Sequence, residues 1–114
     1  MSVTSDGLSR IFAALADPTR RDILSRLKNG PLSVTEIAQP YAMSRPAVSQ
    51  HVSVLESAGL ITRSAQGQLR PCHISAEALA EASEWIATQS ADWDHRFDLL
   101  DQHLRRTAPR EETS

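Results

Sequence analysis

The feature that most constrains this sequence is a set of three aliphatic residues at helical spacing, Val48, Val52 and Leu55. At positions i, i+4 and i+7 they share one face of a helix, so they anchor that helix to a core. Ser44 before them is a good N-cap, and Gly59 after them can take the left-handed conformation that ends helices. The sequence therefore predicts a helix between these two residues whose opposite face is exposed.

A very short helix is predicted just before this one. Ser33 and Glu36 have the spacing of a capping box, and Pro40 ends the segment. Two helices joined by a tight turn result, which is the arrangement of a helix-turn-helix. Two earlier helices are expected, one over residues 8–15 and one after the capping residue Asp17.

A β-hairpin, or wing, is predicted after the helix-turn-helix. Residues 60–62 favour a strand, residues 66–68 have turn composition, and residues 69–74 can return as the second strand. Pro71 removes one donor from the hairpin ladder and confines its strand to an edge. The predicted fold is mainly α with this small wing.

The C-terminal segment is predicted to be a long helix, or two consecutive helices that break near Thr88–Ser90. Its apolar positions are three or four residues apart: Leu79, Ala82, Ile86, Gln89, Trp93, Phe97, Leu100 and Leu104, with one polar member. A continuous helix of about 30 residues would be about 45 Å long, more than a small domain can cover. We therefore expect a homodimer, in which a second copy covers the stripe. The predicted dimer contacts are Leu8, Ile11, Phe12, Leu79, Ile86, Trp93, Phe97, Leu100 and Leu104.

Length and composition indicate one domain over residues 1–114. Within it we expect a core at 8–75, which contains the helix-turn-helix, and a dimerisation helix at 76–106. Aromatic residues make up only 4%, so the core must be aliphatic. The chain has no apolar run long enough to cross a bilayer and no signal sequence at its N-terminus. Because Cys72 is the single cysteine, no internal disulfide can form. We expect a cytoplasmic protein that does not contact membranes.

Charge is divided along the chain, although the formal net charge is only -2. Residues 20–70 hold seven basic and three acidic residues, a net charge of +4, whereas residues 76–104 hold one basic and seven acidic residues, a net charge of -6. A basic segment followed by an acidic helix suits a protein that presents one face to phosphates and keeps another away from them. Charge alone fits two ordinary solvated surfaces equally well.

The exposed face of the helix after Ser44 carries short polar side chains that can reach base edges. A major groove about 12 Å wide admits one helix, and Gln50 can form two hydrogen bonds with adenine. Arg45 suits a phosphate, and Arg63 and Arg70 on the wing can reach the DNA backbone or minor groove. Singly, these residues are typical of any solvated helix, but the order of helices and wing favours duplex DNA as the partner. The predicted DNA-binding residues are Ser44, Arg45, Pro46, Ala47, Ser49, Gln50, His51, Ser53, Arg63 and Arg70.

Three segments resemble the ArsR/SmtB family of bacterial repressors: ADPTRRDILSRL (16–27), SRPAVSQHVSVLESAGLI (44–61) and the turn at Gly67. Ser49, Gln50, His51, Leu55, Gly59 and Leu60 together keep the family spacing. The resemblance implies a winged helix-turn-helix homodimer, paired mainly through its first and last helices, that binds a near-palindromic operator. It also assigns DNA contacts to Ser49, Gln50 and His51. Our hypothesis for the mechanism is that this dimer represses transcription by occluding a promoter.

The family's metal ligands are matched only in part, by the spacing of Asp101 and His103, so no metal or other cofactor is expected. Metal-sensing members carry a cysteine pair where this chain has Leu32, Ser33, Val34 and Thr35. The C-terminal Asp92, Asp94, His95 and His103 fit no standard zinc spacing. No phosphate-binding loop, nucleophile elbow or Cys–His pair supports an enzyme. Two alternatives stay open, a metal- or ligand-responsive sensor of the same fold and a winged-helix module that contacts only proteins.

Overall fold

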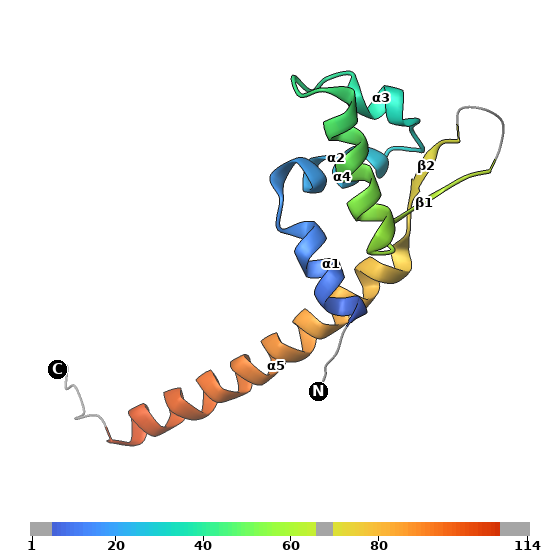
Figure 1. Ribbon diagram of the computed structural model, residues 1–114. Helices are drawn as coiled ribbons and strands as arrows, with labels where there is room; N and C mark the ends of the chain where they lie inside the picture. Colours follow the sequence, from blue (N-terminus) through green and yellow to red (C-terminus); the bar gives the residue numbers. More distant parts are fainter. Residues whose placement is uncertain (1–5, 66–69, 108–114) are drawn as a thin grey trace. The chain divides into compact units, whose positions relative to one another are not determined.

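The computed structural model describes residues 6–65 and 70–107. In chain order the elements are α1 (Gly7–Leu15), α2 (Pro18–Leu27), α3 (Val34–Ala38), α4 (Arg45–Ser57), β1 (Ile61–Arg63), β2 (Cys72–Ile74) and α5 (Ala76–Thr107) (Figure 1). The predicted fold, mainly α with a small β-hairpin, is confirmed. By its contacts the chain divides into two units, Met1–Ala82 and Ser83–Ser114. The single domain over 1–114 stays a prediction.

Short polar side chains start the helices where the sequence predicted them. The side-chain oxygens of Asp17, Ser33 and Ser44 accept hydrogen bonds from backbone N–H groups three residues on, at 3.0, 3.1 and 3.3 Å. Glu36 completes the capping box, because its Oε1 accepts from the N–H of Ser33 at 2.8 Å. Gly59 has a φ of +80° and follows α4 in the predicted left-handed conformation.

An aliphatic core fills the first unit. Val48, Val52 and Leu55 are each 0% exposed, so α4 has the predicted rotation. Ile11, one of the predicted dimer contacts, is only 2% exposed and packs in the core of its own chain. The buried apolar residues are Ile11, Ala14, Ile23, Leu24, Leu27, Ile37, Val48, Val52, Leu55, Leu60, Ile61, Cys72, Ala78 and Ala82.

The wing is a two-stranded antiparallel pair in which Ile61 lies opposite Ile74 and Arg63 opposite Cys72. The second strand begins at Cys72, later than the predicted residue 69, and the predicted turn at 66–68 lies outside the described residues. Leu32, just before α3, also pairs with Cys72, through backbone N···O distances of 3.2 and 2.7 Å. The return strand is thus paired on both sides at Cys72, a contact the sequence reasoning missed. Burial there raises the pKa of the Cys72 thiol.

Helix α5 is continuous through Thr88–Ser90, where a break was considered. The Thr88 hydroxyl donates to the carbonyl of Glu84 at 3.0 Å, one turn back in the same helix. Ala78 and Ala82, in the first turns of α5, are buried in the core of the first unit, which ends at Ala82. The predicted division into a core at 8–75 and a dimerisation helix at 76–106 stays a prediction. No helix within residues 6–65 and 70–107 is both long and apolar enough to span a membrane.

Candidate nucleic-acid interface

Helix α4 presents two contrasting faces. Val48, Val52 and Leu55 are buried, whereas Gln50 and Ser53 are exposed on the other side. At its start, Ser44, Arg45 and Pro46 are also exposed. The three remaining residues predicted to contact DNA from this helix, Ala47, Ser49 and His51, are half-buried. The exposed start of α4, with Gln50 and Ser53, is therefore the part of this helix that is most accessible to a partner.

Arg45 begins α4 and is held by the preceding helix. Its Nη2 donates to Oγ1 of Thr35 in α3 at 2.6 Å. This bond connects the two helices of the helix-turn-helix at their N-terminal ends. Because helix N-termini carry partial positive charge, the Arg45 guanidinium adds to a local field that attracts phosphate.

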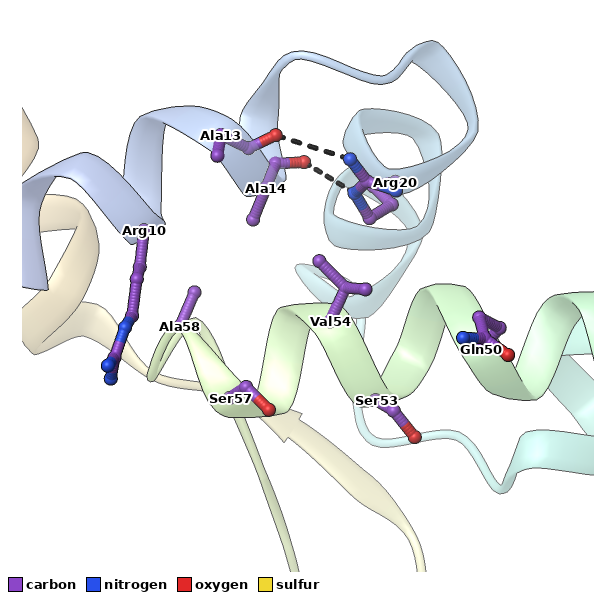
Figure 2. A pocket seen from close by; sticks show the side chains of 9 residues that line it. All are labelled: Arg10, Ala13, Ala14, Arg20, Gln50, Ser53, Val54, Ser57 and Ala58. Atoms are coloured by element: carbon purple, nitrogen blue, oxygen red, sulfur yellow. Dashed lines mark hydrogen bonds between the residues drawn. The ribbon is translucent and has the colours of Figure 1, made fainter.

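Arg20 ties the C-terminus of α1 to α4, and the sequence reasoning missed this role. Its Nε donates to the Ala14 carbonyl at 2.7 Å and its Nη2 to the Ala13 carbonyl at 3.2 Å (Figure 2). These carbonyls belong to the last turn of α1, where a cation is favourable. Its Nη1 lies 3.1 Å from Nδ1 of His51. Because a guanidinium can only donate, Nδ1 accepts this bond and the ring proton of neutral His51 is on Nε2.

Asp17 lies near the same ring nitrogen of His51. Its Oδ2 accepts from the N–H of Arg20 and lies 3.9 Å from Nδ1 of His51. The backbone hydrogen bond from Arg20 is the largest cause of a lowered pKa for the Asp17 carboxyl, with His51 contributing in the same direction. Two groups at the start of α2 thus contact the His51 ring, beside the exposed face of α4.

Two more arginines of the basic segment, residues 20–70, donate hydrogen bonds to backbone carbonyls. Arg21 Nη1 donates to the Leu15 carbonyl at 2.7 Å, and Arg26 donates to the carbonyls of Ile37 and Glu36 at 2.7 and 3.0 Å. With Arg20, three of the seven basic residues between 20 and 70 therefore secure helix ends. Only tertiary contacts could reveal this, because the sequence shows the charges but not their carbonyl partners.

The turn between α3 and α4 is anchored to α2 through Tyr41. The Arg26 guanidinium lies 5.3 Å from the centroid of the Tyr41 ring, and the Tyr41 hydroxyl donates to Oδ2 of Asp22. Burial, followed by this hydrogen bond, raises the pKa of the Tyr41 phenol. These contacts hold the turn, and with it the start of α4, against the rest of the core.

The two wing arginines differ in their surroundings. Nε of Arg63 lies 3.2 Å from Oε1 of Glu56 in α4, close enough for an ion pair, although this buried nitrogen makes no hydrogen bond among the described residues. Arg70 is exposed and has a φ of +41°, a left-handed conformation that is uncommon for a residue with a side chain. Arg70 is therefore the more available of the two for a phosphate.

Comparison with known proteins agrees with this geometry. A helix-turn-helix domain family model matches residues 15–64, which run from the end of α1 to just beyond β1. The HTH-type transcriptional regulator Rv2034 of Mycobacterium tuberculosis is 46% identical over 71 residues, which are 62% of this chain and 66% of that one. The transcriptional repressor SdpR of Bacillus subtilis is 32% identical over 79 residues, which are 69% of this chain and 88% of that one.

A solved structure described as an ArsR family transcriptional regulator, RHA00566, is 42% identical with a TM-score of 0.73, over 78% of this chain and 98% of that one. This chain belongs to the ArsR family. An ArsR-like regulator from Rhodococcus sp. RHA1 has a TM-score of 0.74 at 28% identity, covering 84% of this chain and 91% of that one. The ArsR/SmtB resemblance noted in the sequence is thus confirmed, and this ArsR protein is a DNA-binding regulator of transcription with a winged helix-turn-helix.

Proposed function

We propose that this ArsR protein is a repressor that binds a near-palindromic operator in duplex DNA as a homodimer and blocks a promoter sterically. The observation that carries the proposal is the division of α4 into a buried aliphatic face and an exposed face with Gln50 and Ser53. The relative SdpR is named a repressor, which supports the same role here. A cytoplasmic location and the absence of catalysis belong to this proposal.

In this proposal the N-terminal half of α4 enters the major groove. Gln50 reads adenine through two hydrogen bonds, while Ser49 and Ser53 bond bases or phosphates. Arg45, with Ser44 and Pro46 at the exposed start of the helix, faces the phosphate backbone, and Ala47 allows close approach. Arg63 and Arg70 contact the backbone from the wing. His51, which is bonded to Arg20, lies at the edge of this surface and orients it.

The dimer contacts are proposed to lie mainly on α5. Within the second unit, seven large apolar side chains are 47–58% exposed: Trp85, Ile86, Trp93, Phe97, Leu99, Leu100 and Leu104. An apolar surface of this extent is typical of a protein interface. Leu8, Phe12 and Leu79 pack partly against the core of the first unit, so only their remaining exposed parts can contribute.

The test is binding of the full-length protein to DNA from its own promoter, measured by fluorescence anisotropy against a random duplex. Affinity for the promoter should exceed affinity for random DNA and fall steeply between roughly 50 and 200 mM salt, as phosphate contacts require. Gln50→Ala should weaken specific binding by about 1 to 3 kcal/mol and leave folding unchanged.

Gln102→Ala is the matched control, because Gln102 is an exposed glutamine on the acidic helix α5. It should leave promoter affinity unchanged. Equal affinity of the parent protein for promoter and random DNA would contradict a base-reading role for α4. No DNA complex at low salt would favour a module that contacts only proteins.

A further inference from the structure

A groove lies between α1 and α4, beside the proposed DNA-reading face. It has a volume of about 310 Å³, at the lower end of the range for small-molecule sites. Residues of both helices line it, together with Arg20 of α2: Arg10, Ala13, Ala14, Arg20, Gln50, Ser53, Val54, Ser57 and Ala58. None of these lining residues is a carboxylate, and two are arginines.

The groove is long and has an apolar floor. Figure 2 shows Arg10 near Ala58 at one end of α4 and Gln50 toward the other end, with Ala13, Ala14 and Val54 between them. Gln50 in α4 and Ala58, the residue that follows the helix, are eight residues apart, which is about 12 Å at the rise of a helix. Alanines on both walls leave open the space that larger side chains would fill. An elongated apolar molecule fits this shape.

Arg10 is the cation available to a ligand. Its guanidinium has no hydrogen bond or ion pair with another residue in the described part of the chain. The guanidinium of Arg20, by contrast, already bonds Ala13, Ala14 and His51. A carboxylate paired with Arg10 would gain a charge-assisted hydrogen bond at the end of an apolar channel.

We propose that this groove binds an elongated amphipathic carboxylate, with its carboxylate on Arg10 and its apolar chain over Ala13, Val54 and Ala58. Occupancy places ligand against Gln50 and Ser53, so ligand and DNA compete. The competition rests on the proposed function, whereas binding in the groove does not. A methyl-lined floor offers a hydrated phosphate few donors, which favours this ligand over a DNA phosphate.

The experiment is an NMR titration of the full-length, DNA-free protein with sodium decanoate below its micelle concentration. Saturable shifts are expected at the backbone amides of Ala13, Ala14, Val54 and Ala58. Sodium acetate and sodium phosphate should not saturate these amides. Shifts confined to α5, or saturation of the same amides by phosphate, would overturn the proposal.

Two variants sharpen the test. Ala13→Leu fills the groove from an exposed position on α1, and Arg10→Gln removes the free cation. Each should weaken decanoate binding by roughly tenfold, equivalent to about 1.4 kcal/mol. The matched controls on α5, Ala91→Leu and Arg106→Gln, should bind decanoate as the parent does. Unchanged affinity in Ala13→Leu would contradict the site.

Competition is measured separately, with promoter DNA. Decanoate should raise the apparent Kd of the parent for DNA and leave that of Ala13→Leu unchanged. If decanoate saturates the groove but does not alter DNA affinity, the regulatory part of the proposal is wrong. If the parent binds no DNA, the proposed function fails, while the NMR titration still decides whether the groove is a carboxylate site.

Discussion

A single guanidinium connects three helices of the DNA-binding unit. Arg20 of α2 bonds two carbonyls at the end of α1 and the ring of His51 in α4. Each bond has a charged donor, and such bonds contribute more than neutral ones. The position of α4 relative to α1 therefore depends on this residue. Arg20 acts as a positioning residue rather than as a phosphate contact.

We predict that Arg20→Gln lowers the free energy of unfolding by about 2 kcal/mol, because the guanidinium hydrogen bonds to Ala13, Ala14 and His51 are lost. Promoter affinity should fall as well, since His51 and α4 lose their fixed position. Chemical unfolding and DNA titration measure the two effects. Arg45→Gln is the comparison, and it should weaken DNA binding with little loss of stability. A stable Arg20→Gln variant with normal affinity would contradict the positioning role.

Asp17 gives the protein a specific acid sensitivity. Its pKa in the folded state is lowered from 3.8, first by the backbone hydrogen bond from Arg20, so the unfolded chain binds this proton more readily. The ionised Asp17 carboxylate therefore stabilises the folded state fully above pH 3.8. This stabilisation is lost as the pH falls through the lowered pKa that Asp17 has in the folded state. We predict that Asp17→Asn, which keeps a capping side chain, flattens the fall in stability at acid pH.

Urea unfolding of the parent and Asp17→Asn from about pH 6 to about pH 3 checks this linkage. The two stability curves should converge as the pH falls. Curves that stay parallel over the whole range would show that the carboxylate contributes nothing through its titration.

At the scale of the elements, the end of α4 is the point where backbone conformation matters most. Gly59 has a φ of +80°, and a Cβ added there would meet only Cβ of Ala78 at 4.0 Å, an ordinary contact. The cost of a side chain is therefore conformational. We predict that Gly59→Ala destabilises the protein by about 1 kcal/mol.

Gly7→Ala is the matched control, because Gly7 begins α1 with open space around the added Cβ. This variant should be neutral or stabilising by up to about 1 kcal/mol, since alanine favours helix. Thermal unfolding of both variants gives the comparison. Equal effects would contradict the role of the left-handed conformation at Gly59.

The whole molecule is proposed to work as a dimer joined through α5. Trp93 and Phe97 are 54% and 58% exposed, and their ring centroids are 5.7 Å apart. We predict that Phe97→Glu yields monomers at concentrations where the parent is dimeric, because a charge replaces apolar contact area. Promoter affinity should then fall by at least about tenfold, since the two half-sites are no longer bound together.

Sedimentation of the parent and the variant measures the oligomeric state. Ala91→Glu is the control, because it adds the same charge at an exposed position on the face of α5 opposite Trp93 and Phe97. This variant should remain dimeric. A parent protein that sediments as a monomer while binding its promoter tightly would contradict the proposed dimer.

The sequence alone was sufficient for the caps of α2, α3 and α4 and for the rotation of α4, but it left open whether α5 is continuous. Those features follow from local chemistry: the capping box at Ser33, the left-handed Gly59, and the periodicity of Val48, Val52 and Leu55. A linear sequence reveals capping hydrogen bonds, because the two partners lie within a few residues of each other. It also reveals which face of a helix is buried, because the apolar residues recur at helical spacing.

Only the tertiary structure decided which charges stay free and how distant segments meet. Arg20 and Arg26 find their carbonyl partners on other helices, and Leu32 pairs with Cys72 across the unit. The helical spacing of Ile11 is the same for a residue in the core and for one in an exposed apolar stripe, and only the structure shows that Ile11 lies in the core. Such contacts depend on how elements stack, and no periodic pattern encodes the distance between residues that are far apart in the chain.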